Sequence, residues 1–248
     1  MAWSSWGRAV VIASGWAVGI GCGGSPSVFR ITPVRPVEEL RAEALRATPP
    51  VESGERRPSE LVDLQTLDSS IRLDIRYAST RNFLGTPLYT QARAVLQRPA
   101  AEALVRVHRA LEAQGFGLLV FDAYRPWYIT KLFWDATPPE QHEFVADPAT
   151  GSRHNRGCAV DITLFVRSTG RPVTMPSLYD EMSSRAAADY PGGTADARRL
   201  RDILRRAMEA EGFSVYAPEW WHFDFRDWPQ YAVQNLPFEA IPRTGARP

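Results

Sequence analysis

The sequence predicts an α+β fold in a single domain. Two segments carry the 3.6-residue apolar period of amphipathic helices, and two others alternate apolar and polar side chains as half-buried strands do. Strands and helices follow one another along the chain, which is typical of α+β domains. With 248 residues, 44% of them hydrophobic, the chain is long enough for one sizeable core together with further segments.

Residues 1–22 have the pattern of an export signal. Arg8 is their only charge, and residues 9–20 are uninterrupted apolar and small residues. About a dozen such residues are too few for a hydrocarbon core that needs roughly 20. They end in Gly19-Ile20-Gly21-Cys22, which resembles the lipobox of bacterial lipoproteins, with Gly19 where Leu is usual. Two expectations stay open, lipidation of Cys22 as a membrane tether and ordinary secretion, and both place the protein in the periplasm or cell envelope.

Residues 23–58 are expected to form a flexible, Pro-rich linker. Six prolines lie there among Ser, Gly, Glu and Arg, without a sustained apolar period. A brief helix over residues 37–47 is conceivable but would have little to pack against. The folded domain is therefore expected to cover residues 59–248.

The first half of this domain is predicted to contain two strands and a helix. Residues 71–77 alternate apolar and charged side chains, which indicates a half-buried strand. A helix is expected from Pro99 to Gln114, with its apolar face on one side and Gly115 placed to end it. Residues 117–122 then form a short apolar strand, and a loop or helical turn is expected up to Gly151.

The second half continues with a strand, a helix and an aromatic segment. Residues 158–165 alternate, so Asp161 projects from the side opposite the main aliphatic row. A second amphipathic helix is expected over residues 195–211, because apolar residues recur there at helical spacing and Gly212 follows. Residues 219–225 are aromatic enough for a strand or its lead-in.

Charge and cysteine content narrow the function classes. The formal charge of +1, without a long Lys/Arg run, excludes an electrostatic footprint for nucleic acid. Two cysteines, Cys22 and Cys158, cannot form a disulfide framework. Cys158 is interpreted as a small buried apolar residue, with a bridge to Cys22 as the alternative.

Two of the four histidines lie in segments that suit a catalytic metal site. Such a site needs three His, Asp or Glu ligands, an open position for water and a carboxylate beside it. His154 and Asp161 are seven residues apart across a glycine-containing loop, so both can reach one ion, and His222 follows Glu219 by three. Glu219 can reach the same place only if the backbone near Pro218 is irregular, because i and i+3 face opposite ways on a regular strand.

These segments together resemble the zinc D,D-peptidase family, and within it the D-alanyl-D-alanine dipeptidases of the vancomycin-resistance type. The resemblance runs from about residue 63 to residue 225. It implies a mainly antiparallel central sheet flanked by helices. The matching motifs are Ser152-x-His154-x-x-Gly157-x-Ala159-x-Asp161, Glu219-x-x-His222, Tyr124-Arg125-Pro126 and Arg76-Tyr77-Ala78 with Asn82-Phe83.

The resemblance also implies a role for each site residue. One Zn²⁺ per chain would be held by His154, Asp161 and His222. Glu219 would act as general base, and Arg125 would stabilise the oxyanion.

The same resemblance extends to substrate binding. Asp180 would receive the free ammonium of a dipeptide, although Met175-Pro176-Ser177-Leu178-Tyr179 departs from the Gly-Thr-x-Phe usual before that Asp. Ser152 would contact the substrate, and Asp122 would orient Arg125. Arg125 could alternatively be only a structural ion-pair partner of Asp122 or Asp161.

The implied function is zinc-dependent hydrolysis of D-alanyl-D-alanine, or of a similar D,D-dipeptide, in cell-wall peptide turnover. Two alternatives share the metal site. A D,D- or L,D-carboxypeptidase acting on peptidoglycan stem peptides would need an open amino-terminal side, against which Asp180 argues. A non-catalytic zinc-containing binding module of the cell envelope would lack the base, whereas Glu219 and Arg125 are both present.

Overall fold

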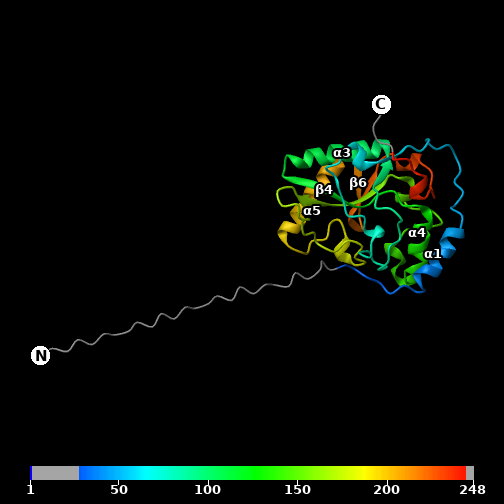
Figure 1. The fold of residues 1–248 in the computed structure, drawn as a ribbon, viewed down its shortest axis with the longest axis horizontal. Helices are drawn as coiled ribbons and strands as arrows, with labels where there is room; N and C mark the ends of the chain where they lie inside the picture. The colour runs from blue at the N-terminus through cyan, green and yellow to red at the C-terminus, as the bar shows by residue number, and fades with distance from the viewer. Residues whose placement is uncertain (2–27, 244–248) are drawn as a thin grey trace.

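A computed structural model describes residue 1 and residues 28–243 of the chain (Figure 1). The predicted export signal, Cys22 included, therefore lies outside the described residues apart from Met1. Within the described residues, no helix is both long enough and apolar enough to cross a membrane.

A five-stranded sheet forms the centre of the domain, and its strands come from both halves of the chain. The β2–β4 pair is parallel, and the other three pairs are antiparallel. The predicted mainly antiparallel sheet is therefore confirmed. In sheet order the strands are β2 (Arg72–Leu73), β4 (Phe116–Asp122), β5 (Ala159–Val166), β7 (Glu219–Phe225) and β6 (Phe213–Tyr216).

Two long helices cover one face of this sheet. Helix α3 (Arg98–Glu112) packs on β4, and helix α5 (Ala195–Ala210) packs on β5, β6 and β7. Because α3 and α5 also contact each other, both lie on the same face of the sheet. Both helices and the strands β4, β5 and β7 form where the sequence predicts them. Val160, Ile162 and Leu164 of β5 are fully buried in the core.

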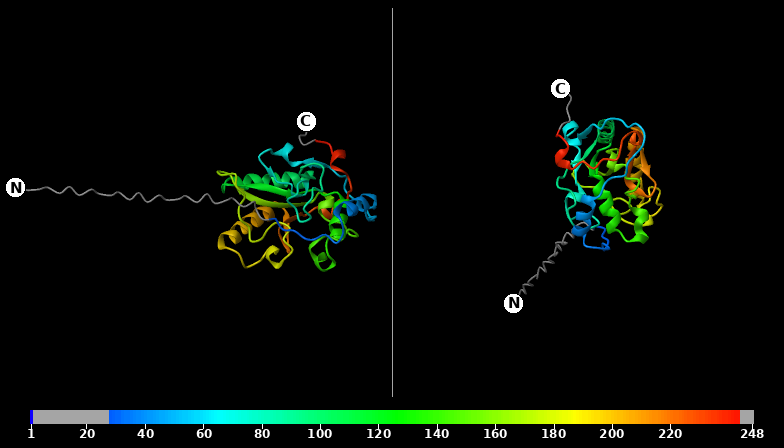
Figure 2. Two further views of the ribbon diagram at one scale, coloured as in Figure 1. Left: turned by 60° about the horizontal axis from the view of Figure 1, so that its bottom comes forward. Right: turned by 90° about the vertical axis from the view of Figure 1, so that its right-hand side faces the viewer.

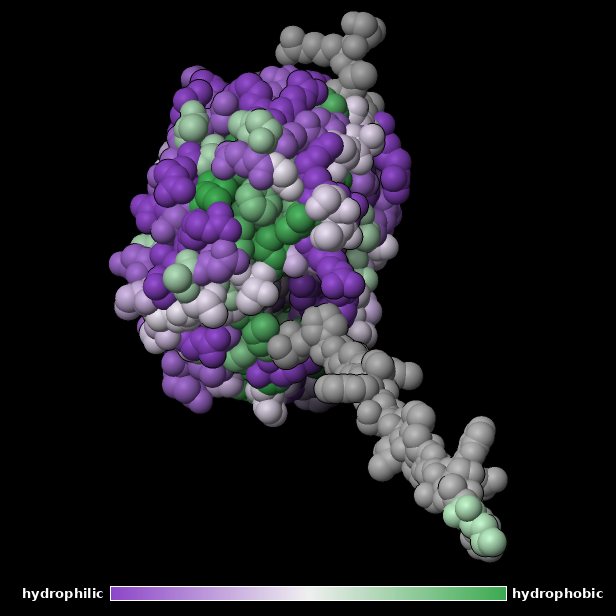
Figure 3. All heavy atoms as spheres, turned by 90° about the vertical axis from the view of Figure 1, so that its left-hand side faces the viewer, coloured by the Kyte–Doolittle hydropathy of each residue, from purple (hydrophilic) through white to green (hydrophobic). Residues whose placement is uncertain are grey.

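The remaining elements surround this core (Figure 2). A two-stranded antiparallel sheet joins β1 (Leu61–Asp63) to β3 (Val95–Gln97), and helix α2 (Leu64–Leu67) follows β1 directly. Short 3-10 helices lie in the connections: Arg76–Ala78, Pro139–Phe144, His154–Arg156, Ser184–Ala186, Trp228–Gln230 and Phe238–Ala240. Hydrophilic side chains cover most of the face shown in Figure 3, with an apolar patch near its middle.

The prediction of a flexible linker over residues 23–58 is wrong for residues 28–58, the part that the structure describes. Helix α1 (Val37–Arg46) packs on helix α4 (Trp127–Ala136), and Leu40 and Ala44, four residues apart, are fully buried in that contact. Further along, Glu52 accepts hydrogen bonds from Arg156 Nη2 and from the backbone N–H of Val233. The segment has something to pack against because α4 exists, and the sequence pattern did not predict that helix.

Two other elements differ from the prediction. Helix α4, ten residues long, occupies part of the interval expected as a loop or helical turn, and its buried residues include Trp127, Ile129 and Leu132. The strand expected over residues 71–77 stops after Leu73, and the chain turns into a 3-10 helix at Arg76. Asp74 contributes to this early end, because its carboxylate pairs with Arg76 and Arg81 at the turn.

Candidate metal centre and active site

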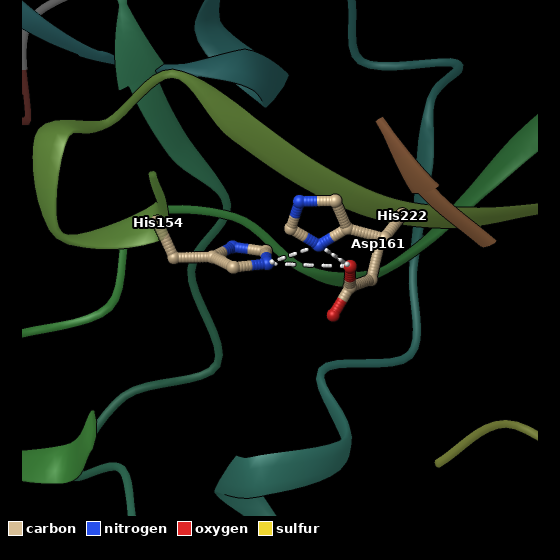
Figure 4. A group of neighbouring side chains, drawn as sticks. All are labelled: His154, Asp161 and His222. Carbon is tan, nitrogen blue, oxygen red and sulfur yellow. Dashed lines mark hydrogen bonds and ion pairs between the residues drawn. The ribbon is translucent and has the colours of Figure 1, made fainter. Parts of the chain in front are cut away.

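Three potential metal ligands from distant parts of the chain meet at one point (Figure 4). Strands β5 and β7 place Asp161 directly opposite His222, and His154 begins the 3-10 helix just before β5. His154 Nε2 lies 3.0 Å from His222 Nδ1, and Asp161 Oδ1 lies 3.3 Å and 3.1 Å from these two nitrogens. All three residues are buried. The structure thus brings together the three side chains that the sequence singled out.

A second layer of contacts fixes the donor atoms of this triad. His154 Nδ1 donates to the carbonyl of Ala123 at 2.7 Å, which leaves Nε2 with its lone pair toward the centre. His222 Nε2 lies 2.9 Å from Asp224 Oδ1 and donates to it, so Nδ1 is the nitrogen that faces the other two ligands. Tyr179 donates its hydroxyl proton to Asp161 Oδ2 at 2.8 Å. Metal-binding histidines usually have such outer partners, which set their tautomer.

The spacing and chemistry of the triad fit a divalent metal. Ligands about 2.0–2.1 Å from a tetrahedral zinc lie about 3.3 Å from one another, close to the separations found here. Burial alone raises the pKa of Asp161, but His154 and His222 outweigh burial and hold that pKa well below its usual range. Burial also opposes protonation of His222, yet its contacts with Asp161 and Asp224 raise its pKa to about 10. The cluster therefore favours a positive charge at its centre.

An irregularity in β7 brings Glu219 to the same place. Opposite β6, the pairing jumps from Val215 with Phe223 to Tyr216 with Glu219, so β7 carries extra residues at this point. Glu219 Oε2 consequently lies 3.7 Å from His222 Nδ1. Burial raises the pKa of the Glu219 carboxyl to about 7, against the opposing effect of His222 and with a further rise from Asp161. A carboxyl group with that pKa can exchange protons near neutral pH.

Arg125 is buried at the edge of the cavity and anchored by Asp122. Its Nε and Nη2 donate to Asp122 Oδ2 at 3.0 Å and 2.8 Å, and Nη2 lies 3.9 Å from Asp161 Oδ2. The guanidinium also stacks over Phe133, 4.8 Å from the ring centroid. The structure thus contains the predicted Asp122–Arg125 contact. It also keeps a permanent positive charge beside the triad.

Asp180 is partly buried and lines the same cavity. Its two carboxylate oxygens accept from the hydroxyl of Tyr77 at 2.9 Å and 3.1 Å. Burial, with a contribution from the Asp161 carboxylate, raises the pKa of Asp180 well above its usual range. Asp180 has φ of +60°, the one positive value among described non-glycine residues, in the left-handed region that Asp adopts more readily than most residues.

Ser152 lines the cavity and also organises the turn that carries His154. Its hydroxyl oxygen accepts from the backbone N–H of His154 at 3.1 Å, and its own N–H donates to Asn155 at 2.7 Å. Cys158, in contrast, is fully buried away from the site, and burial raises the pKa of its thiol to about 12. His108 is buried in α3, and His142 is in the 3-10 helix that begins at Pro139.

The cavity around these residues has a volume of about 290 Å³. Pockets for drug-sized ligands run from roughly 300 to 1,000 Å³, so this cavity lies at the small end of that range. Its polar lining includes the triad, Glu219 and Arg125. Two contacts to the triad were not predicted from the sequence pattern: that of Asp224 with His222 and that of Tyr179 with Asp161. Because side chains alternate between the two faces of a strand, Asp224, two residues beyond His222, lies on the same face of β7. This spacing could have indicated that Asp224 contacts His222.

Comparison with known proteins identifies the family of this chain. The model of the D-ala-D-ala dipeptidase family matches residues 57–241. The chain belongs to this family. The D-alanyl-D-alanine dipeptidase of Escherichia coli strain K12 is 35% identical over 178 residues, which cover 72% of this chain and 89% of that protein. The chain is accordingly an enzyme, a peptidase of the D-ala-D-ala dipeptidase family.

Two further dipeptidases of this family show the same similarity. The D-alanyl-D-alanine dipeptidase of Enterococcus faecium is 34% identical, with 67% of this chain and 91% of that protein covered. That of Streptomyces coelicolor is 35% identical, with coverages of 66% and 90%. A solved structure of the LdcB LD-carboxypeptidase overlaps with a TM-score of 0.40 at 20% identity, covering 70% of this chain and 71% of that chain.

Proposed function

We propose that this enzyme hydrolyses D-alanyl-D-alanine, or a close D,D-dipeptide, with one zinc ion held by His154, Asp161 and His222. The observation that carries the proposal is the convergence of these three side chains within 4.8 Å of one another, in a chain of the D-ala-D-ala dipeptidase family. A zinc ion bound there supplies Lewis-acid activation of a water molecule and of the scissile carbonyl.

The residues of the chain perform the remaining steps. Glu219 takes a proton from the attacking water as the new C–O bond forms. It returns that proton to the leaving amine as the C–N bond breaks. Arg125 stabilises the negative charge that develops on the carbonyl oxygen. Asp180, held by Tyr77, binds the substrate ammonium, which restricts the enzyme to peptides with a free amino end at that position.

A hydrolysis assay of the purified enzyme tests this function. We expect turnover of D-alanyl-D-alanine, little turnover of L-alanyl-L-alanine, and loss of activity with a chelator that added zinc restores. The substrate ammonium must reach Asp180, so a stem pentapeptide should be a poor substrate. Preferred turnover of the pentapeptide would instead support a D,D- or L,D-carboxypeptidase, and activity that persists in chelator without bound metal would contradict the metal site.

Asp224 offers a direct test of the proposed ligands. Asp224→Asn removes the negative charge that accepts the hydrogen bond from His222 Nε2, so His222 Nδ1 donates its electron pair to the metal less strongly. We expect zinc affinity to fall about 10- to 100-fold, as for other outer partners of metal ligands. The measurement is competition with a chromophoric chelator. Asp227→Asn, the same change in a residue that pairs with Arg57 on the surface, is the control and should bind zinc as the parent does.

We also propose that residues 1–22 direct export, so that the enzyme meets dipeptides released by cell-wall turnover. The support is the apolar stretch before Cys22. Fractionation should find the enzyme in the cell envelope or periplasm. Labelling with palmitate should distinguish a tether from secretion, since Cys22→Ala abolishes incorporation only if Cys22 carries lipid. Recovery of the intact chain in the cytoplasm would contradict export.

A further inference from the structure

We infer that Arg153 binds the terminal carboxylate of the dipeptide, so that the enzyme recognises both charged ends of its substrate. This inference rests on the proposed function and adds a specificity residue to it. A free dipeptide carries an ammonium group at one end and a carboxylate at the other. Asp180 accounts for the first, and the second needs a cation on the cavity wall.

The cavity wall offers few places for a carboxylate. Six acidic side chains line it, and they would repel a second negative charge: Glu143, Asp147, Asp161, Asp180, Glu181 and Glu219. The lining contains two arginines, Arg125 and Arg153. Arg125 is already held by Asp122 through two hydrogen bonds. Arg153 is therefore the cation left for the carboxylate.

Two aromatic rings position the guanidinium of Arg153 and leave its hydrogen-bond donors available. It lies over the ring of Trp228, 4.8 Å from the centroid, and at 6.0 Å from that of Tyr216. Its Nε is buried without a hydrogen-bond partner, 3.6 Å from Asp224 Oδ2. No acceptor in residues 28–243 takes a hydrogen bond from its side chain, which is 41% exposed. Such a group can present a planar fork to an incoming carboxylate.

Main-chain hydrogen bonds hold the backbone at Arg153. Its carbonyl accepts from the N–H groups of Arg156 and Cys158, and His154 follows directly in sequence. The neighbouring Arg156 differs, because its guanidinium is buried and donates to the carbonyl of Tyr231 and to Glu52. Arg156 is structural, whereas the guanidinium of Arg153, although ion-paired with Asp224, still has its hydrogen-bond donors available for a ligand.

Asp180 and Arg153 lie near different residues of the triad. Asp180 connects to Asp161 through the hydroxyls of Tyr77 and Tyr179. Arg153 lies beside Asp224 and Tyr216, which both contact His222. Both residues line the same cavity as the triad. A dipeptide whose two ends meet Asp180 and Arg153 has its single peptide bond between them, within that cavity.

The experiment compares D-alanyl-D-alanine with its terminal amide, which lacks only the negative charge. Calorimetry on the zinc-loaded full chain carrying Glu219→Gln measures binding without hydrolysis. We expect this protein to bind the acid about 10- to 100-fold more tightly than the amide, the range of a charged hydrogen bond. Adding Arg153→Gln should reduce the affinity for the acid to that for the amide and leave the amide unchanged. Arg205→Gln, on the exposed side of α5, is the control.

Each outcome decides the question. Equal binding of acid and amide before Arg153 is changed, or equal weakening of both after it, would overturn the role of Arg153. Zinc content is measured in every variant, because Arg153 lies beside Asp224. If the parent enzyme hydrolyses D-alanyl-D-alanine but shows no acid preference, only this inference fails. If the parent enzyme does not hydrolyse the dipeptide at all, the proposed function fails and this inference with it.

Discussion

Replacing Glu219 by Gln should lower kcat on D-alanyl-D-alanine by about 10²–10⁴-fold, the contribution of a positioned general base. The amide has nearly the shape of the carboxylate but cannot accept the proton of the attacking water. The ligands of the triad remain, so zinc content and thermal stability should not change. Steady-state kinetics, metal analysis and thermal unfolding measure the three quantities.

The pH dependence of activity provides an independent test of the role of Glu219. Glu219 acts as a base only when ionised, so activity should fall as pH decreases through its pKa. That pKa is about 7 from burial and the neighbouring side chains, and a bound cation lowers it, which places the acidic limb at or below neutral pH. Glu219→Gln should remove this limb. Glu209→Gln on the surface of α5 is the control, and a Glu219→Gln enzyme within threefold of the parent rate would exclude the general-base role.

The parts of the site that could be predicted are those encoded by short-range spacing. His154 and Asp161 lie in one motif, and His222 and Glu219 lie in another, so two local patterns contain all four residues. The requirement for an irregular backbone near Pro218 followed from the period of a strand. The structure has the corresponding shift between Val215 and Tyr216, opposite Glu219.

The parts that could not be predicted depend on contacts between distant segments. Helix α4 contains Trp127, Ile129 and Thr130, whose intrinsic preference for helix is modest, and it is stabilised by burial against the rest of the domain. Helix α1 depends in turn on α4. The hydroxyl of Tyr179 meets Asp161 only because the chain returns to β5 after a long connection. No periodicity in the sequence carries that information.

Replacing Arg125 by Lys should lower kcat by about 10²–10³-fold with little change in KM. A residue that stabilises the developing oxyanion acts mainly in the transition state, and its loss costs about 3–4 kcal/mol of barrier. Lysine keeps the charge but cannot present the planar fork that Asp122 orients through Nε and Nη2. Steady-state kinetics on D-alanyl-D-alanine check the split between kcat and KM.

The alternative role of Arg125, as a structural partner of Asp122, predicts a different pattern. Arg125→Gln alone leaves Asp122 buried without its partner, which should destabilise the fold by about 3–5 kcal/mol. Adding Asp122→Asn removes the unpaired charge and should recover most of that stability. If Arg125 stabilises the oxyanion, kcat stays low in this double variant although the fold is restored. Recovery of kcat together with stability would show that Arg125 has only a structural role, because a neutral pair of similar shape would then suffice.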